Sequence, residues 1–187
     1  MNDVPVGAIH RREGYSFQLV NIECMPQSDH YNVIMVLEEP MDDLLPYLAA
    51  VLPACTYVHG TGVINLMDEG HIVGIYGDRI TITDVTGLDD AEEWCERYRA
   101  RIEDVKRRKD SIEPVERRQV SLTVLEIYRR LPGTNCGACG DATCMAFAAR
   151  VFRREIPFTA CPEASPEDPE TSRFVNQLAA QGFPAGS

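Results

Sequence analysis

The sequence predicts an α+β protein, with an N-terminal antiparallel sheet covered by helices and a small helical part near the C-terminus. Three observations support this class. Short runs of β-branched and aromatic residues, separated by turn formers, fill residues 15–85. A helical repeat of apolar residues follows from Asp89. Four of the seven cysteines then lie between Cys136 and Cys161.

The first half of the chain contains six predicted strands and one helix. Tyr15–Cys24 and His30–Glu39 are predicted strands, and Met41–Leu52 is a predicted helix with an early turn at Pro46. Four shorter strands follow, at residues 55–60, 62–68, 71–77 and 79–85. Their spacers are too short for parallel crossovers, so we expect antiparallel hairpins.

A long amphipathic helix is predicted after these strands. Its apolar stripe should cover one face of the sheet, and it consists of Ala91, Trp94, Cys95, Tyr98, Ile102 and Val105. The order strand, helix, four antiparallel strands and long helix resembles one repeat of the TATA-binding-protein fold. The resemblance concerns the pattern of elements alone, and the acidic sheet region argues against DNA binding.

Glu113 and Pro114 end the long helix, so we predict an α+β domain at residues 1–113, a cysteine-containing domain at 114–164 and a polar tail at 165–187. Within the second domain, one helix is expected before the cysteines, and its apolar face would be formed by Val120, Val124, Ile127, Tyr128 and Leu131. A further helix is expected at 142–154 with Asp141 as its N-cap, and a short one in the tail at 173–180.

Composition excludes several classes of protein. The 44% of apolar residues suffices for a core, and no apolar run approaches the ~20 residues that span a bilayer, so we expect a cytoplasmic protein. The net charge of −11 argues against nonspecific nucleic-acid binding. The charge is uneven, because residues 94–154 carry 14 Lys or Arg against 8 acids. An odd number of cysteines, four of the seven in one short stretch, favours metal binding over disulfides.

The spacing of the four clustered cysteines is Cys136-x2-Cys139-x4-Cys144-x16-Cys161. The chain after the predicted helix reaches about 23 Å when extended, which exceeds the helix length of about 18 Å, so the last sulfur can return to the others. Zinc sites typically use two short-spaced pairs, whereas this chain has one pair and two single cysteines. The pattern favours a 4Fe-4S cluster, with zinc and unligated thiols as the alternatives.

The glycines of this stretch are predicted to serve the same site. Gly137 and Gly140 allow sharp turns that aim backbone N–H groups at sulfur, and we include the Ala142 N–H among the candidate donors. Arg150, Arg153 and Arg154 either offset the negative charge of a cluster or form an ordinary exposed helix face. The remaining cysteines, Cys24, Cys55 and Cys95, are predicted core residues.

Residues 131–162, LPGTNCGACGDATCMAFAARVFRREIPFTACP, resemble the four-cysteine 4Fe-4S domain of the corrinoid iron-sulfur protein large subunit and of the B subunit of Rnf-type electron transport complexes. The matching features are Leu-Pro before the loop, Asn before the first Cys, Gly directly after the second Cys, Thr before the third Cys and Pro after the last Cys. The resemblance implies that Cys136, Cys139, Cys144 and Cys161 ligate one cluster that passes single electrons at low potential. The cobalamin-ligating pattern Asp-x-His-x-x-Gly is absent.

We therefore expect a carrier or redox module of a larger complex in anaerobic metabolism, with a corrinoid protein or an oxidoreductase as its protein partner. No catalytic residues are predicted, because the sequence has no nucleophile triad order and no phosphate-binding glycine loop. The chain is then an electron-transfer subunit of an oxidoreductase or methyltransferase system and not an enzyme by itself. The alternative is an adaptor with a structural or sensory cluster, or with zinc.

Overall fold

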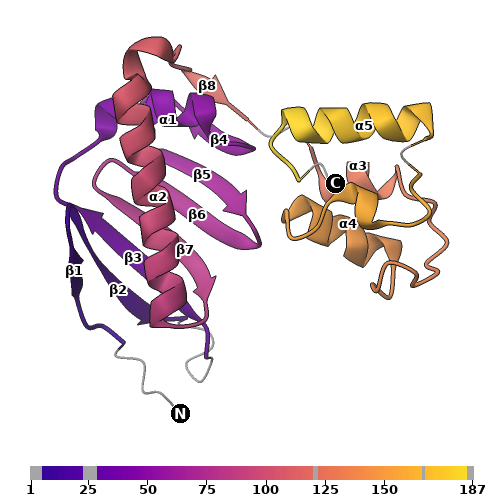
Figure 1. Cartoon of the computed structure of the whole chain (residues 1–187), viewed down its shortest axis with the longest axis horizontal. Coiled ribbons are helices and arrows are strands. Elements are labelled where there is room, and N and C mark those ends of the chain that lie inside the picture. Colours follow the sequence, from indigo (N-terminus) through magenta and orange to yellow (C-terminus); the bar gives the residue numbers. More distant parts are fainter. Residues whose placement is uncertain (1–5, 23–28, 120–121, 166, 185–187) are drawn as a thin grey trace. The chain divides into compact units, whose positions relative to one another are not determined.

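The computed structural model describes residues 6–22, 29–119, 122–165 and 167–184 (Figure 1). The chain divides into two compact units, one of residues 1–66 and 71–118 and one of residues 67–70 and 119–187. An antiparallel sheet accompanied by several helices confirms the α+β class. The domain limits 1–113, 114–164 and 165–187 stay a prediction.

The first unit is built on an eight-stranded sheet with the order β1-β2-β3-β7-β6-β5-β4-β8. All strand pairs whose registers are described run antiparallel. The strands are β1 His10–Arg12, β2 Tyr15–Asn21, β3 Tyr31–Leu37, β4 Cys55–Val58, β5 Val63–Asp68, β6 His71–Tyr76, β7 Arg79–Val85 and β8 Arg117–Arg118.

The register places buried residues of neighbouring strands side by side. Met35 of β3 lies opposite Phe17 of β2 and Ile80 of β7, and Ile80 lies opposite Ile75 of β6. Each of these four residues is at most 1% exposed. Alternation along the strands therefore gives the sheet one continuous apolar face.

Two helices pack on this apolar face. A 3₁₀ turn, Asp42–Leu44, leads into α1, Leu45–Val51, in which Pro46 occupies the first turn where its missing N–H costs nothing. The long helix α2, Leu88–Arg108, crosses the sheet (Figure 1), and a 3₁₀ turn, Lys109–Ser111, follows it. The predicted stripe of α2 is confirmed, because all six of its residues are at most 4% exposed.

Two strands of the first unit lie outside the sequence-based expectations. β1 pairs with β2 through a two-residue turn in which Gly14 has a φ of 83°. β8, which pairs with the edge strand β4, is two residues long. We predicted that the first strand extends to Cys24. This boundary cannot be compared with the structure, because residues 23–28 lie outside the described part of the chain.

The second unit contains the helices α3, Val124–Tyr128, α4, Cys144–Phe152, and α5, Pro169–Ala180, and a 3₁₀ turn, Phe158–Ala160. α3 packs against α4, and the ring of Phe158 meets that of Phe174 edge-on at 5.1 Å. The buried apolar side chains of this unit are Leu122, Ile127, Leu131, Phe147, Ala148, Val151, Phe158, Ala164, Phe174, Leu178 and Phe183. They form a small core of the kind that a unit of this size can bury.

The helices of the second unit differ in length from the expectations. α3 has one and a half turns because Thr123 and Glu126 form a capping box at its start and Pro132 disfavours helix at the preceding residue. Val120, which we predicted on its apolar face, lies outside the described residues. α5 begins four residues earlier than predicted, because Asp168 caps it and Pro169 occupies its first position.

No helix within the described residues is both long enough and apolar enough to span a bilayer.

Candidate metal centre

The four clustered cysteines line one cavity in the second unit. Cys136 and Cys139 come from the loop before α4, Cys144 from the first turn of α4 and Cys161 from the turn after Phe158–Ala160. The other lining residues are Leu131, Pro132, Asn135, Gly137, Asp141 and Phe147. The four thiols therefore line one common cavity, whose wall includes the apolar side chains of Leu131, Pro132 and Phe147.

Glycine shapes the loop that carries the first two cysteines. Gly137 and Gly140 have φ values of 72° and 88°, which are ordinary for glycine and strained for other residues. The Gly140 N–H donates to the Gly137 carbonyl at 3.0 Å and closes a tight turn around Cys139. If the Gly140 N–H also donated to a cluster sulfur, it would have to be shared between that sulfur and the Gly137 carbonyl. Cys136 is exposed at the surface and Cys139 is partly covered.

Cys144 is fixed by the start of α4. The N-cap of this helix is Thr143, whose Oγ1 accepts the Ala146 N–H at 3.1 Å, so the prediction of Asp141 as the cap is wrong. Thr143 is the N-cap because it directly precedes Cys144, the first helical residue. Asp141 lies too far upstream to reach the first free N–H groups. Cys144 is 8% exposed and lines the cavity.

Asn135 ties the loop to the helix. Its Oδ1 accepts the Cys144 N–H at 2.8 Å, which satisfies one of the donors that a helix start leaves unpaired. Asn135 has a φ of 52°, a conformation that asparagine tolerates better than most residues. Asn135 is part of the sequence motif, but nothing in the motif predicts its hydrogen bond to Cys144.

Cys161 is held by the core behind it. Its N–H donates to the carbonyl of Phe158, which is 1% exposed and packs against Phe174 of α5. The Cys161 carbonyl accepts the Ala164 N–H, so a second turn follows at once. The cysteine itself is 6% exposed. The last thiol therefore returns to the first three on a packed segment.

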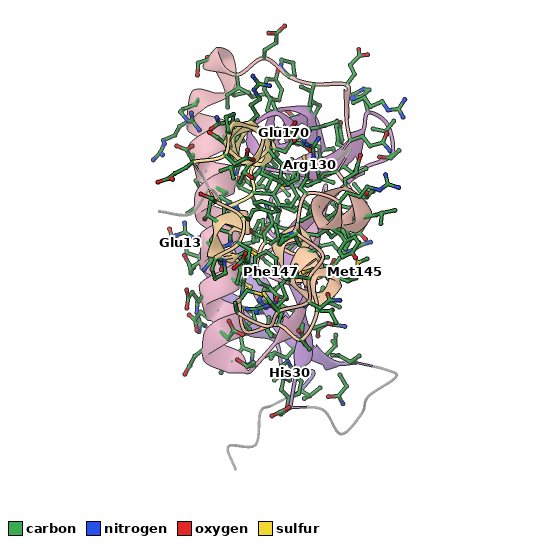
Figure 2. The ribbon with its side chains drawn as sticks, turned by 90° about the vertical axis from the view of Figure 1, so that its right-hand side faces the viewer. Glu13, His30, Arg130, Met145, Phe147 and Glu170 are labelled. Atoms are coloured by element: carbon green, nitrogen blue, oxygen red, sulfur yellow. The ribbon has the colours of Figure 1, made fainter. Side chains whose placement is uncertain are left out.

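The helix α4 has one face in the core and one at the surface. Phe147 lines the cavity and is 1% exposed, whereas Met145 is 42% exposed (Figure 2). Residues 132–140 of the adjoining loop contain no charged side chain. Met145 is therefore an exposed apolar side chain of α4, and the loop sequence around Cys136 carries no charge as far as Asp141, which lines the cavity.

The three arginines at the end of α4 all have carboxylate partners. Arg150 contacts Asp141 at 3.1 Å and Glu155 at 3.2 Å, Arg153 contacts Glu155 at 3.0 Å, and the buried Arg154 contacts Asp68 of the same unit at 3.0 Å. Burial lowers the pKa of the Arg150 guanidinium, but the charge of Asp141 and the bond to Glu155 outweigh burial and leave the pKa raised. Arg154 is buried, the Arg150 side chain is 37% exposed and that of Arg153 is 48% exposed, so the expectation of an exposed face holds for Arg153 and fails for Arg154.

The other described cysteines belong to the first unit and are core residues, as predicted. Cys55 and Cys95 are fully buried, and the Cys55 thiol donates to the Ala49 carbonyl. Burial, and then the charges of Glu96 and Glu92, raise the pKa of Cys95 to about 12. Cys24 lies outside the described residues.

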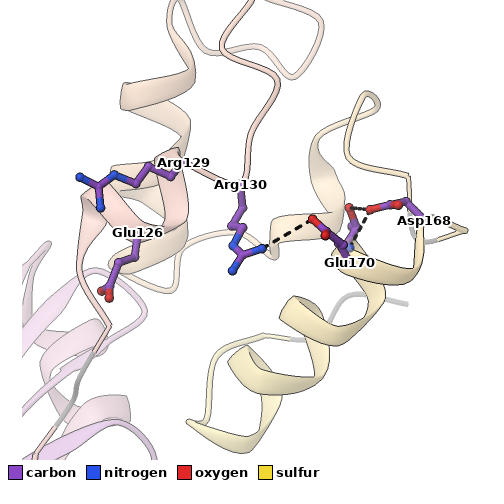
Figure 3. A pocket seen from close by; sticks show the side chains of 6 residues that line it. Glu126, Arg129, Arg130, Asp168 and Glu170 are labelled. Carbon is purple, nitrogen blue, oxygen red and sulfur yellow. Dashed lines mark hydrogen bonds and ion pairs between the residues drawn. The ribbon is translucent and has the colours of Figure 1, made fainter.

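A second hollow of the same unit lies between α3 and the start of α5 (Figure 3). Four of the five charged side chains that line it have partners within the unit: Arg130 approaches Glu170 at 3.9 Å, Asp168 accepts from Thr171, and Glu126 accepts from Thr123. Arg129 also lines the hollow and has no described ion pair. The lining contains none of the four clustered cysteines. It is not the candidate site.

The donor set of the cavity fits an iron-sulfur cluster. Four thiols approach it from three separate segments, and thiolates are the ligands that such clusters use. Over the described residues, no three His, Cys, Asp or Glu side chains are close enough together to hold a single metal ion. The observation that supports a metal centre is the shared cavity, and not a set of ligands already arranged around a single ion.

Comparison with known proteins finds a family model that matches the segment containing the four cysteines of the cavity. Residues 131–163 match the family model described as "Putative Fe-S cluster". This stretch contains all four cysteines of the cavity and most of the α3–α4 connection. The resemblance that the sequence motif indicated is confirmed for this segment.

Curated relatives match the same part of the chain. The acetyl-CoA decarbonylase/synthase complex subunit gamma of Methanothermobacter thermautotrophicus is 40% identical over 60 residues, which are 32% of this chain and 13% of that protein. Subunit gamma 2 of Methanosarcina thermophila is 47% identical over 55 residues, 29% and 11% of the two chains. The corrinoid/iron-sulfur protein large subunit of Moorella thermoacetica is 48% identical over 44 residues, 24% and 10%.

The matched region spans about a tenth of the length of these relatives. No solved structure matches the chain. The element order β3, α1, β4 to β7 and α2 agrees with the expected order of the first unit, but its resemblance to a TATA-binding-protein repeat stays a prediction.

Proposed function

We propose that Cys136, Cys139, Cys144 and Cys161 ligate one 4Fe-4S cluster and that the protein passes single electrons, as a carrier or as the redox module of a larger complex. The observation that carries this proposal is the common cavity of the four thiols. The match of residues 131–163 to an iron-sulfur family supports the same cofactor. When bound, such a cluster supplies a one-electron couple between its oxidised and reduced states.

Two features support a cluster over zinc. The ligands arrive as one close pair and two single cysteines, whereas structural zinc sites use short-spaced pairs around a small ion. The cavity walls are apolar where Leu131 and Phe147 lie, and a shell of this kind limits access of water to a cluster. The N–H groups of Gly137, Gly140 and Ala142 are the proposed hydrogen-bond donors to sulfur.

The loop that carries Cys136 is the proposed entry point for electrons. Cys136 is the exposed member of the four, and its sequence neighbours, residues 132–140, carry no charged side chain. The centres of protein interfaces are depleted in charge, so this surface suits a protein partner that approaches the cluster edge. We propose a corrinoid protein or an oxidoreductase as that partner, since the relatives are named as subunits of a complex and as a corrinoid/iron-sulfur protein.

We propose no catalytic residue in this chain. All four cysteines would be cluster ligands, so no thiol of the cavity remains for substrate chemistry. The protein would then serve an oxidoreductase or methyltransferase system in anaerobic metabolism and act in the cytoplasm. An adaptor with a structural cluster or with zinc is the alternative to be excluded.

Metal analysis of the anaerobically purified protein tests the ligand set. We expect roughly four irons and four sulfides per chain. Single Cys→Ala variants at 136, 139, 144 and 161 should lose most of this iron, because each removes one ligand. Cys55→Ala and Cys95→Ala are matched controls from the first unit and should keep it. One zinc per chain without sulfide would replace the redox proposal with a zinc-stapled adaptor.

A further inference from the structure

Asp141 and Arg150 form an ion pair at the wall of the cysteine cavity. Asp141 lies between Cys139 and Cys144 and lines the cavity with them. Arg150 Nη1 donates to its Oδ2 at 3.1 Å from the second turn of α4. The pair therefore joins the loop that carries two of the thiols to the helix that carries the third.

The guanidinium of Arg150 is held from a second side. Its Nε donates to Glu155 Oε2 at 3.2 Å, and Glu155 Oε1 contacts Arg153 at 3.0 Å. Glu155 lies just beyond the end of α4, so two carboxylates fix the direction of one arginine. The side chain of Asp141 is 11% exposed and that of Arg150 is 37% exposed. Solvent screens such a pair less than a fully exposed one.

The two charges act on the cavity in opposite directions. A 4Fe-4S cluster with four thiolates is negative and gains a further negative charge on reduction. A nearby positive group stabilises the reduced form and raises the reduction potential, and a nearby negative group lowers it. Arg150 and Asp141 would therefore shift the reduction potential in opposite directions, and each would offset the effect of the other.

We propose that the Asp141–Arg150 pair is a positioning device that holds the Cys136–Cys139 loop against α4 and tunes the reduction potential of the site. The inference rests on the proposed function, because it needs a bound cluster. Arg150 is here a positioning residue and not a ligand. The family match and the motif name neither role.

The test is a set of single and double variants whose potentials are measured by EPR-monitored titration. Asp141→Asn removes a negative charge and should raise the potential, and Arg150→Gln should lower it. The double variant should fall between the two. Arg173→Gln removes the same positive charge from α5, at a residue that does not line the cavity, and should shift the potential less than Arg150→Gln does.

Iron release to a chelator under anaerobic conditions tests the positioning role separately. Asp141→Asn and Arg150→Gln should release iron roughly two- to fivefold faster, because a partly exposed pair of this kind contributes modestly to closure of the loop. Arg150→Lys keeps the charge but cannot reproduce the two directed donors. It should release iron faster at a nearly unchanged potential, and it covers the case in which Arg150→Gln fails to fold.

The outcomes separate this inference from the proposed function. A wild-type protein that binds zinc and no sulfide overturns both. A wild-type protein with the cluster, whose two single variants shift the potential in the same direction or not at all, overturns the tuning role alone. Unchanged iron release in all variants overturns the positioning role.

Discussion

The side chain of Asn135 accepts the backbone N–H of Cys144 across nine residues, at 2.8 Å. This hydrogen bond connects the residue that precedes the first cysteine to the residue that begins α4. The loop 135–144 is therefore closed on itself by a hydrogen bond within the chain. We regard this closure as the reason why three of the four thiols face the same cavity.

Substitution of Asn135 should loosen the loop by two separable effects. Asn135→Gly loses the hydrogen bond but tolerates the φ of 52°, and it should cost about 1 kcal/mol of unfolding free energy. Asn135→Ala loses the bond and also strains the backbone, so we expect about 1 kcal/mol more. Denaturant unfolding of the two variants measures the difference. Equal stabilities of both variants and the wild type would contradict a structural role for Asn135.

Alkylation of the metal-free, reduced protein at pH 8 should follow exposure. Cys136 should react first because it is exposed, and Cys144 and Cys161 should react slowly because they are 8% and 6% exposed. Cys95 should react last, since burial raises its pKa to about 12 and leaves little thiolate. Peptide mass spectrometry gives the order. Rapid labelling of Cys95 in the folded protein would contradict the structure of the first unit.

The start of α5 should respond to acid through Asp168. Its carboxylate accepts the Thr171 N–H, and this bond lowers the pKa of Asp168 below its ordinary value. A depressed folded-state pKa gives stability that is present above the unfolded pKa of about 3.9 and is lost as pH falls through the folded value.

The matched variant for this acid effect is Asp168→Asn, which keeps the cap without a titrating group. The wild type should lose its stability advantage over the variant below about pH 4. Thermal unfolding of both proteins between pH 6 and pH 3 measures it. A constant difference over that range would show that the charge of Asp168 plays no part.

Much of the first unit was predictable because its signals are strong and local. The stripe from Ala91 to Val105 repeats at the helical period over more than a dozen residues, and the structure buries every member. The hairpin of β1 and β2 was not predicted, because a three-residue strand of His10–Arg12 has no apolar alternation. The two-residue strand β8 has no signal of its own and depends on the edge of β4.

The cysteines that line the candidate site were predictable from the sequence, but the contacts that hold them in place were not. Cysteine spacing pointed to Cys136, Cys139, Cys144 and Cys161, because thiols at such intervals have few other uses in a reduced protein. The N-cap of α4 is Thr143 and not Asp141 because the helix starts two residues later than predicted, a difference that propensity does not resolve. Asp141 is paired with Arg150 instead, a contact between residues nine positions apart that only the fold creates.

The most direct test of the account is an EPR-monitored redox titration of the anaerobic protein, with circular dichroism at each end point. We predict a spin-half signal that appears on reduction, disappears on reoxidation and is absent in Cys136→Ala, with the fold unchanged throughout. Such a couple would establish one-electron chemistry at the cavity of the four thiols. A protein that contains iron and sulfide but has no reversible couple, or that unfolds on reduction, would contradict the electron-transfer function and leave a structural cluster.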